Sequence, residues 1–383
     1  MFIFKEKKFM KYLFVLLFSI LTISNLSAQQ VINSTLSHGG ITRNYILFVP
    51  ASYDPSTPAP LVFSFHGYSS NAALNMNYTG FTAIADTAGF ILVHPDGTLD
   101  GTGTPHWNVG GWTVGSQIDD VGFTEAMIDE ISASYNINAN RVYSCGMSNG
   151  GYMSFKLACE LSDRIAAIAS VTGSMTPQIS NACSPSHPTP ILQLHGTADP
   201  TVPYNGSPTW TLAIDDVIDY WVGFNNCNTT PIITAIDDTD PSDGTNVDHF
   251  VYAGGDNGVT TEHFKVYNGE HDWFGVWGNM DISSSIEIWK FFSKYDINGS
   301  LANVNELTVV NEIKVFPNPS NEYISVNMPI SDDLDYQIVS MEGKIIKSGT
   351  LSNTLPSIDI SCLSNDIYFL KIENEVLKFV VKR

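Results

Sequence analysis

The feature that most constrains the fold is an alternation between short apolar segments and longer segments of helical periodicity, running from Val31 to roughly Lys294. The apolar segments include PLVFSFHG, FILVHPDG, RVYSCGMS, IAAIASVTG and PILQLHGTADP. Near-continuous apolar runs of this length are typical of parallel strands that are covered on both faces. The segment GFTEAMIDEISASYN, between two of them, places its apolar residues at helical spacing. We therefore predict an α/β domain with a mostly parallel central sheet.

The chain changes character near Gly299. The stretch NGSLANVNELTVVNE is polar, and the segments after it, such as YQIVSMEGKIIKSGT and VLKFVVKR, alternate at strand period without helical patterns. We predict the α/β domain at residues 29–297, a linker at 298–310 and a small, sandwich-like all-β module at 311–383. The module contains no convergent set of catalytic residue types, so we expect it to serve in attachment, sorting or packing.

Residues 1–28 have the features of a secretory signal peptide. Lysines precede the apolar run YLFVLLFSILTI, and small residues precede Gln29, so we predict cleavage after Ala28. The run is too short and wrongly flanked for a membrane span. The formal net charge of −21 repels phosphate backbones and anionic lipid surfaces, so nucleic acid is not an expected partner. We expect the mature protein to be exported, soluble and monomeric.

Export permits disulfide bonds, and the chain contains five cysteines, so at least one of them is unpaired within the chain. Cys183 and Cys227 lie in loop-like sequence, and we predict a bridge between them. Cys145 ends a buried strand pattern and Cys159 lies within a helix pattern, where a small apolar residue suffices. For these two cysteines, a buried thiol and a bridge both remain open.

A serine between glycines stands where a strand pattern becomes a helix pattern. In CGMSNGG, residues Gly146, Ser148 and Gly150 have the G-x-S-x-G spacing of a nucleophile elbow, a strained turn that projects the serine hydroxyl. The motif requires a strand before it and a helix after it, and RVYSC and YMSFKLACEL supply both patterns. A glycine-rich turn with an incidental serine is the structural alternative. We predict that Ser148 is a nucleophile.

A serine hydroxyl is a weak nucleophile at neutral pH, so Ser148 requires a histidine base that a carboxylate orients. With this elbow the chain order is serine, carboxylate, histidine. We predict Asp199 as the acid because it directly follows the strand pattern ILQLHGT, although an Asp-Pro turn is the alternative reading. We predict His271 as the base because it lies in a glycine-flanked loop after a strand. The other histidines that follow the serine are His187, His195, His249 and His263, and we interpret His195 as structural.

Acyl transfer also requires backbone N–H groups that bind the oxyanion. One comes from the residue after the nucleophile, here Asn149, and the other from an early strand-to-helix loop. The stretch VFSFHGYSS supplies that loop. We predict the N–H of Tyr68 as the second donor, with Gly67 as the alternative.

The motifs LVFSFHGYSS, HPDGT, WNVGG, DDVGF, CGMSNGG, HGTADPTVPY and GEHDWFG occur in order over almost the whole first domain. Together they resemble the secreted polyhydroxybutyrate depolymerase and feruloyl esterase family of α/β hydrolases. The resemblance implies an α/β-hydrolase fold, esterase activity and a triad that falls on Ser148, Asp199 and His271. It also implies carboxylic esters as substrates: feruloyl or acetyl esters on plant polysaccharide, or hydroxyalkanoate polyesters. One departure is Glu270, where the family commonly has a glycine.

Aromatic residues flank several of the motif loops. We predict that Trp107, Trp112 and Trp273 contact the substrate, as a platform for a ferulate ring or a sugar face. The alternative is that each ring packs its own loop.

The C-terminal module resembles a second known family. VFPNPSNEYISV and the terminal IYFLKIENEVLKFVVKR are similar to the C-terminal sorting domain that Bacteroidetes-type bacteria use for type IX secretion across the outer membrane. The resemblance implies that the outer-membrane secretion machinery reads this module, and that the protein is secreted or held at the cell surface.

We therefore predict a secreted serine esterase that requires no cofactor and no metal. A peptidase of the prolyl oligopeptidase kind shares the triad order, but the chain lacks a propeller-sized extra domain. A non-catalytic binding module at the cell surface is the other alternative, and it requires the whole catalytic set to be a relic.

Overall fold

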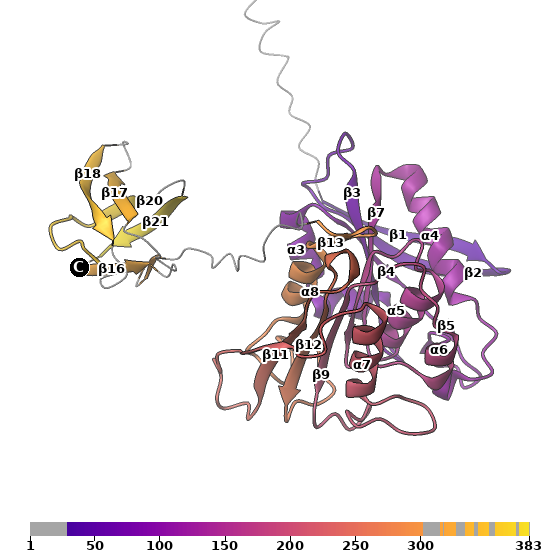
Figure 1. Cartoon of the computed structure of the whole chain (residues 1–383). Helices are drawn as coiled ribbons and strands as arrows, with labels where there is room; N and C mark the ends of the chain where they lie inside the picture. Colours follow the sequence, from indigo (N-terminus) through magenta and orange to yellow (C-terminus); the bar gives the residue numbers. More distant parts are fainter. Residues whose placement is uncertain are drawn as a thin grey trace, which may run out of the picture. The chain divides into compact units, whose positions relative to one another are not determined.

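The computed structural model describes residues 29–301, 315–316, 318–326, 334–340, 344–351, 357–372 and 375–382. The chain forms two compact units that divide between residues 304 and 305 (Figure 1). The predicted signal peptide and residues 302–310 of the predicted linker lie outside the described residues. Gly299 and Ser300, which also belong to the predicted linker, pair with strand β13 of the first unit. The predicted domain boundaries stay predictions.

A ten-stranded sheet forms the centre of the first unit, in the order β1-β2-β4-β3-β7-β8-β9-β12-β11-β10. The strands β4, β3, β7, β8, β9 and β12 run parallel, whereas both edges of the sheet are antiparallel. The strands of this sheet are β1 (Gln30–His38), β2 (Ile41–Val49), β3 (Ala59–Phe65), β4 (Ile91–Pro95), β7 (Ile137–Met147), β8 (Ala167–Val171), β9 (Ile191–Gly196), β10 (Ile232–Ala235), β11 (Asn246–Tyr252) and β12 (Thr261–Tyr267). The α/β fold with a mostly parallel sheet is confirmed.

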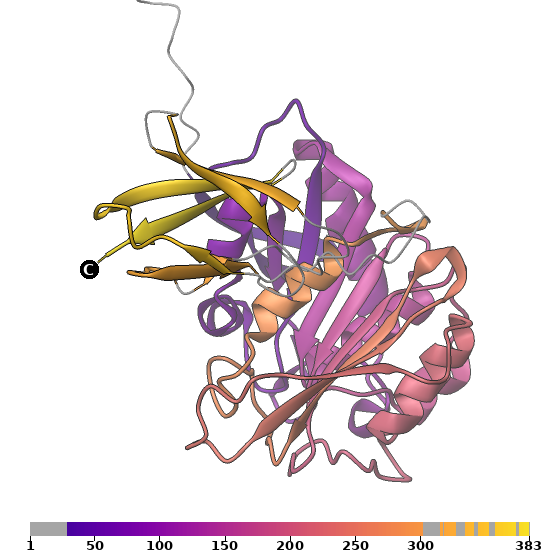
Figure 2. The ribbon, with the colours of Figure 1, turned by 60° about the vertical axis from the view of Figure 1, so that its left-hand side comes forward.

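Helices cover both faces of this sheet, which makes three layers (Figure 2). Apolar residues of α4, α5, α6 and α7 pack into the core on one face, and those of α3 and α8 pack into the core on the other. The helices are α2 (Ala72–Thr79), α3 (Phe81–Ala88), α4 (Asp120–Ser134), α5 (Asn149–Glu160), α6 (Pro177–Ala182), α7 (Ile214–Phe224) and α8 (Ser284–Phe292). Strands β3, β4, β8 and β9 are buried along their whole length, because they are covered on both sides.

Short elements complete the first unit. They are β5 (Thr98–Leu99), β6 (Pro105–His106), β13 (Tyr295–Asp296), β14 (Gly299–Ser300) and the 3₁₀ turns η1 (Gly111–Thr113) and η2 (Asp256–Gly258). Strands β5 and β6 form a small hairpin in the loop that follows β4.

The parallel strands determine where the predicted catalytic residues lie. Strand β7 leads directly into Ser148, β9 is followed by Asp199, and β12 is followed by His271. Carboxyl ends of parallel strands meet at one edge of a sheet, which is where open α/β sheets bind their ligands. Three residues that are far apart in the sequence therefore converge on this edge.

The second unit is an all-β module, as predicted. It consists of an antiparallel sheet β15-β16-β19 and a second antiparallel sheet β18-β17-β20-β21. Its strands are β15 (Val315–Phe316), β16 (Tyr323–Val326), β17 (Leu334–Ser340), β18 (Ile345–Leu351), β19 (Ser357–Asp359), β20 (Asp366–Ile372) and β21 (Glu375–Val381). Ile324 and Ile358 from the first sheet share a buried core with Ile338, Leu370 and Phe379 from the second. This shared core makes the module a small sandwich.

Candidate active site

Ser148 occupies a strained turn between β7 and α5. Its φ is 53° and its ψ is −120°, a conformation that residues other than glycine rarely adopt. Its N–H donates to the carbonyl of Val171 on the neighbouring strand, at 2.8 Å. A Cβ at Gly150 would lie 2.1 Å from the carbonyl oxygen of Phe65, so only glycine fits there. The geometry is that of a nucleophile elbow, as the sequence spacing predicts.

Asp199 and His271 are joined by a hydrogen bond. The Nδ1–H of His271 donates to Oδ2 of Asp199 at 2.7 Å. The other oxygen, Oδ1, accepts the N–H groups of Thr201 and Val202, each at 2.8 Å. Burial opposes ionisation of Asp199, but the interactions with His195 and His271 outweigh it, so the pKa of Asp199 lies well below its usual range. The carboxylate is therefore charged and held in a fixed plane.

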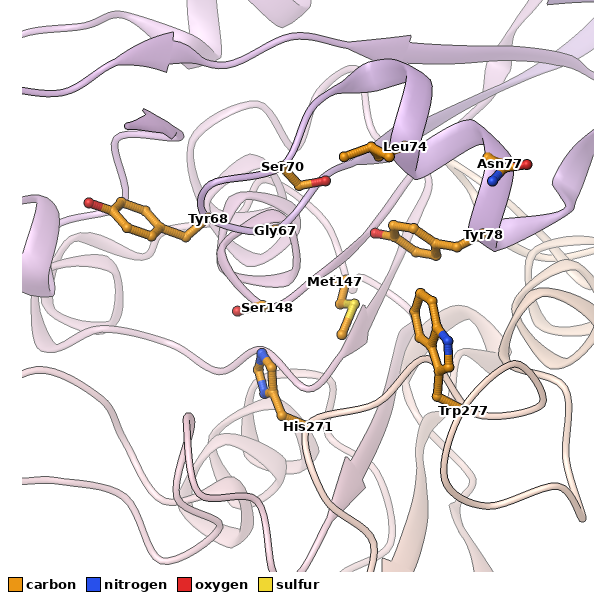
Figure 3. Close-up of a pocket in the computed structure, with 10 residues that line it drawn as sticks. All are labelled: Gly67, Tyr68, Ser70, Leu74, Asn77, Tyr78, Met147, Ser148, His271 and Trp277. Carbon is orange, nitrogen blue, oxygen red and sulfur yellow. The ribbon is translucent and has the colours of Figure 1, made fainter. Parts of the chain in front are cut away.

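Ser148 and His271 line the same pocket, which has a volume of about 380 Å³. Figure 3 shows the His271 ring pointing towards Ser148. Among the described contacts no hydrogen bond joins these two side chains. Such bonds are often long in unliganded enzymes and shorten when the substrate binds.

Tyr68 and Gly67 lie beside the serine. A Cβ at Gly67 would be 3.5 Å from the Cβ of Ser148, so the backbone of this loop passes close to the nucleophile. The Tyr68 hydroxyl donates to Oδ2 of Asp100 at 2.6 Å, which fixes the loop from its outer side. Within the described residues, neither the N–H of Tyr68 nor that of Asn149 donates a hydrogen bond. Both groups have the freedom that an oxyanion hole requires.

Two of the predicted substrate contacts are wrong. Trp107 is fully buried, and its Nε1–H donates to the carbonyl of His66 at 2.8 Å. Trp273 is 1% exposed, and its Nε1–H donates to Oγ of Ser285 at 3.1 Å. Both rings face the core because burial of a large apolar surface is favourable and their single N–H group finds a partner there. Proximity to a motif in the sequence did not indicate the direction of either side chain.

Trp112 is 38% exposed but does not belong to the residues that line the pocket. Its ring packs edge-on against Tyr152, with centroids 4.9 Å apart, and against Trp210, with centroids 5.3 Å apart. Its predicted contact with substrate stays a prediction.

The apolar wall of the pocket consists of residues that the sequence patterns did not indicate. Leu74, Tyr78, Met147 and Trp277 line it together with Tyr68. The rings of Tyr78 and Trp277 lie side by side, with centroids 5.3 Å apart (Figure 3). Trp277 follows His271 in the same loop, and this proximity to the predicted base is the one feature of the sequence that indicates a place in the pocket. Tyr78 lies on α2, and nothing in the local sequence distinguished it from a core residue.

The predicted bridge between Cys183 and Cys227 is also wrong. Cys159, near the end of α5, pairs with Cys183, which follows α6, and their Cα atoms are 4.5 Å apart. Cys227 is a buried free thiol. The pairing follows from the packing of α5 against α6, which the sequence pattern of either helix does not reveal. For Cys145, the structure selects the buried thiol.

Metal clusters and membrane-spanning helices are both absent from the residues that the structure describes. These residues contain no group of three or more His, Cys, Asp or Glu side chains arranged to hold a metal ion. They also contain no helix with the length and apolarity needed to span a membrane.

Comparison with known families matches both units. Residues 54–219 match the phospholipase/carboxylesterase family, and residues 314–383 match the secretion system C-terminal sorting domain. An acetyl xylan esterase from Aspergillus awamori has a similar fold, with a TM-score of 0.50 and 12% identity over 69% of this chain and 98% of that chain.

Among curated proteins, the chain is 26% identical over 275 residues to the bifunctional acetylxylan esterase/xylanase XynS20E of Neocallimastix patriciarum. It is 30% identical over 199 residues to feruloyl esterase B of Piromyces equi. These alignments cover 71% and 49% of this chain, but only 36% and 37% of the two relatives. The chain thus spans little more than a third of their length.

The fold, the elbow at Ser148 and these matches agree with one another, and the sorting domain indicates export. The first unit therefore has an α/β-hydrolase fold in which residues 54–219 are similar to the phospholipase/carboxylesterase family, and residues 314–383 are similar to the secretion system C-terminal sorting domain.

Proposed function

We propose that this protein is a secreted serine esterase that hydrolyses carboxylic esters through an acyl-enzyme on Ser148. One observation carries the proposal: His271, hydrogen-bonded to Asp199, lines the same pocket as Ser148, which stands at the apex of a strained turn. A nucleophile, a base and a group that orients the base are the minimum for this chemistry. The esterases among its relatives support the same reaction class.

In the acylation step, Oγ of Ser148 attacks the ester carbonyl while Nε2 of His271 takes the hydroxyl proton. The carbonyl oxygen becomes an oxyanion and accepts hydrogen bonds from the N–H groups of Tyr68 and Asn149. The tetrahedral intermediate then collapses, and His271 gives its proton to the departing alcohol. The acyl group remains on Ser148.

In the deacylation step, water replaces the alcohol. His271 removes a proton from this water as it attacks the acyl carbon, and the same two N–H groups bind the second oxyanion. Collapse of this intermediate returns the proton to Ser148 and releases the carboxylic acid. The charged carboxylate of Asp199 stabilises the imidazolium form of His271 in both steps.

The pocket next to Ser148 favours an aromatic acyl group. Tyr78 and Trp277 offer two ring surfaces, and Leu74 and Met147 extend the apolar wall. A volume of about 380 Å³ lies within the range of small-molecule sites and greatly exceeds an acetyl group. We therefore rank feruloyl esters ahead of acetyl esters and hydroxyalkanoate polyesters.

Two further parts of the chain fit a polymeric substrate outside the cell. Trp112 presents an exposed ring that can contact a sugar face on the alcohol side of the ester. The sorting domain supports delivery to the cell surface or the medium, and we propose that the type IX machinery reads it.

The test is release of acid by the chain from residue 29 onward, with Ser148→Ala as its matched control. The substrates are methyl ferulate, acetylated xylan and a short hydroxybutyrate oligomer. We expect turnover of methyl ferulate to be the fastest and to fall by about 10⁵–10⁶-fold in the variant, because the remaining catalysis comes from the oxyanion donors and binding alone.

Two other results would redirect the proposal. Serine-dependent turnover of the acetyl or hydroxybutyrate ester alone would keep the mechanism and change the substrate. No serine-dependent turnover of any ester would favour a peptidase or a non-catalytic binding module, which a panel of prolyl peptides and a xylan-binding measurement would separate.

A further inference from the structure

His195 lies in β9 and is fully buried beside the predicted catalytic acid. Its Nε2 is 2.9 Å from the carbonyl oxygen of Val202 and 3.4 Å from Oδ2 of Asp199. Its Nδ1 is 3.1 Å from the side-chain Nε2 of Gln193. Its position at the end of a strand predicts a structural role.

These contacts determine where the imidazole carries its proton. The amide nitrogen of Gln193 donates to the carbonyl of Gly173 at 2.9 Å and also faces Nδ1 of His195. An amide nitrogen only donates, so Nδ1 is the acceptor. The carbonyl of Val202 only accepts, so Nε2 carries the hydrogen. The Nε2–H of His195 therefore donates to the Val202 carbonyl, and Oδ2 of Asp199 lies 3.4 Å from the same nitrogen.

Oδ2 of Asp199 is thus approached by two histidines. His271 donates to it at 2.7 Å, and the Nε2–H of His195 lies 3.4 Å from it on another side. Oδ1 accepts two backbone N–H groups, those of Thr201 and Val202. Both oxygens of the carboxylate therefore have neighbours in addition to His271. Rotation of the carboxylate would break several contacts at once.

We propose that His195 is a positioning residue for the reaction: its Nε2–H shares Oδ2 of Asp199 with His271 and holds the carboxylate where it orients the His271 imidazole for base catalysis. This role rests on the proposed function. His195 does not touch the substrate, because it is fully buried and does not line the pocket.

The charged groups around Asp199 are consistent with this role. Besides the two histidines, the groups that interact with it are Tyr152 from α5 and Asp272 from the loop after β12. Neither of them donates a hydrogen bond to the carboxylate. Burial raises the pKa of Asp199, and the largest opposing contribution is the interaction with His195, ahead of that with His271.

The test compares His195→Asn with His195→Gln in the chain from residue 29 onward. The shorter asparagine keeps a polar group for Gln193 but cannot reach Asp199, whereas the glutamine amide can place an N–H near the position of Nε2. We expect kcat for methyl ferulate to fall by about 10- to 100-fold in the Asn variant, with KM unchanged, since a misplaced catalytic group costs that much. The Gln variant should recover most of this loss.

The pH dependence of kcat is a second measurement, and a histidine that only packs the core would not change it. Without the N–H of His195, one group that stabilises the negative charge of Asp199 is lost. The carboxylate then stabilises the protonated form of His271 more strongly. The acid limb of kcat should therefore move to higher pH in the Asn variant and return in the Gln variant. Melting curves show whether each variant is folded.

Each outcome bears on a different claim. Wild-type kcat and an unmoved acid limb in folded His195→Asn, with turnover abolished in Ser148→Ala, would overturn the positioning role alone. Turnover that survives in Ser148→Ala would overturn the proposed function and the positioning role with it. If the Asn variant does not fold, ¹⁵N NMR of the wild-type imidazoles decides: protonated Nε2 in His195 supports the role, and protonated Nδ1 contradicts it.

Discussion

Asp199 and Asp120 are both buried carboxylates of the first unit, yet they have different partners. Asp199 accepts a hydrogen bond from His271 at the edge of a pocket. Asp120, in the first turn of α4, forms an ion pair with the buried Arg43, at 2.7 Å. The Arg43 guanidinium also lies over the Phe123 ring, 3.9 Å from its centroid. Burial alone therefore does not distinguish the proposed catalytic acid from a structural one.

The difference lies in what the partner can do. A histidine changes its protonation state near neutral pH, so a carboxylate beside it controls a proton. A guanidinium keeps its charge at every pH a protein experiences, so a carboxylate beside it controls only structure. Oδ2 of Asp120 accepts the N–H of Asn108, which anchors the loop that carries Trp107. Asn149 in turn binds the backbone of Trp107, so the structural acid supports the active site indirectly.

The sharpest test of this contrast is Asp199→Asn. The amide keeps the size of the side chain and still accepts the backbone N–H groups on one side, so the fold should survive. It no longer favours the imidazolium form or the correct tautomer of His271, so we expect kcat to fall by about 10³–10⁴-fold. Steady-state kinetics on methyl ferulate measure this.

The matched control for that variant is Asp216→Asn, which changes an exposed carboxylate in the first turn of α7. It should leave kcat within about twofold. If Asp199→Asn lost less than tenfold, Asp199 would not be the acid of the triad.

Asp120→Asn should show the opposite pattern. It removes the carboxylate that pairs with the buried Arg43 guanidinium, and we expect a loss of about 3–5 kcal/mol in the free energy of unfolding. The kcat of the folded fraction should stay within a few-fold of wild type. Urea unfolding monitored by tryptophan fluorescence measures the loss of stability.

The neighbouring Asp119→Asn is the control for this effect. Asp119 caps α4 through the N–H of Gly122, and its side chain is 60% exposed. Asparagine caps helices equally well, so we expect a change within about 0.5 kcal/mol. Equal destabilisation by both variants would show that the ion pair with Arg43 is not the source.

The smallest effect concerns the pH dependence of stability. The pKa of Asp199 in the folded protein lies well below its usual value. Its charged form therefore stabilises the fold fully above the unfolded pKa of about 3.9, and this contribution is lost as the pH falls through the folded pKa. Urea unfolding at pH 6 and pH 3 should show wild type more stable than Asp199→Asn at pH 6, with the gap smaller at pH 3. A gap that stays constant would mean that Asp199 makes no ionisation-dependent contribution.

The backbone conformation around Ser148, Asp199 and His271 agrees with the sequence predictions. The elbow at Ser148 and the strand-end loops of Asp199 and His271 depend on local patterns: a strand, a turn with glycines, then a helix or loop. Such patterns need only neighbouring residues, because the strain of the turn and the glycines that permit it lie within a few positions. The roles of these residues in catalysis remain for the experiments above.

The sequence did not predict the direction in which a side chain points. Trp107 and Trp273 turn into the core, whereas Tyr78 and Trp277 line the pocket, although all four are aromatic residues of the same unit. A ring can bury its apolar surface on either side of a loop, and only the packing of neighbouring elements decides which side is available.

By itself, the sequence determined the α/β architecture, the all-β module and the turn at Ser148, because hydrophobic periodicity and glycine spacing are local properties. Only the tertiary structure decided that Cys159 pairs with Cys183, that Tyr78 and Trp277 form the pocket wall, and that His195 reaches Asp199. Each of these depends on distances between elements that are far apart in the chain. Those distances are set by how the layers pack, which no single segment encodes.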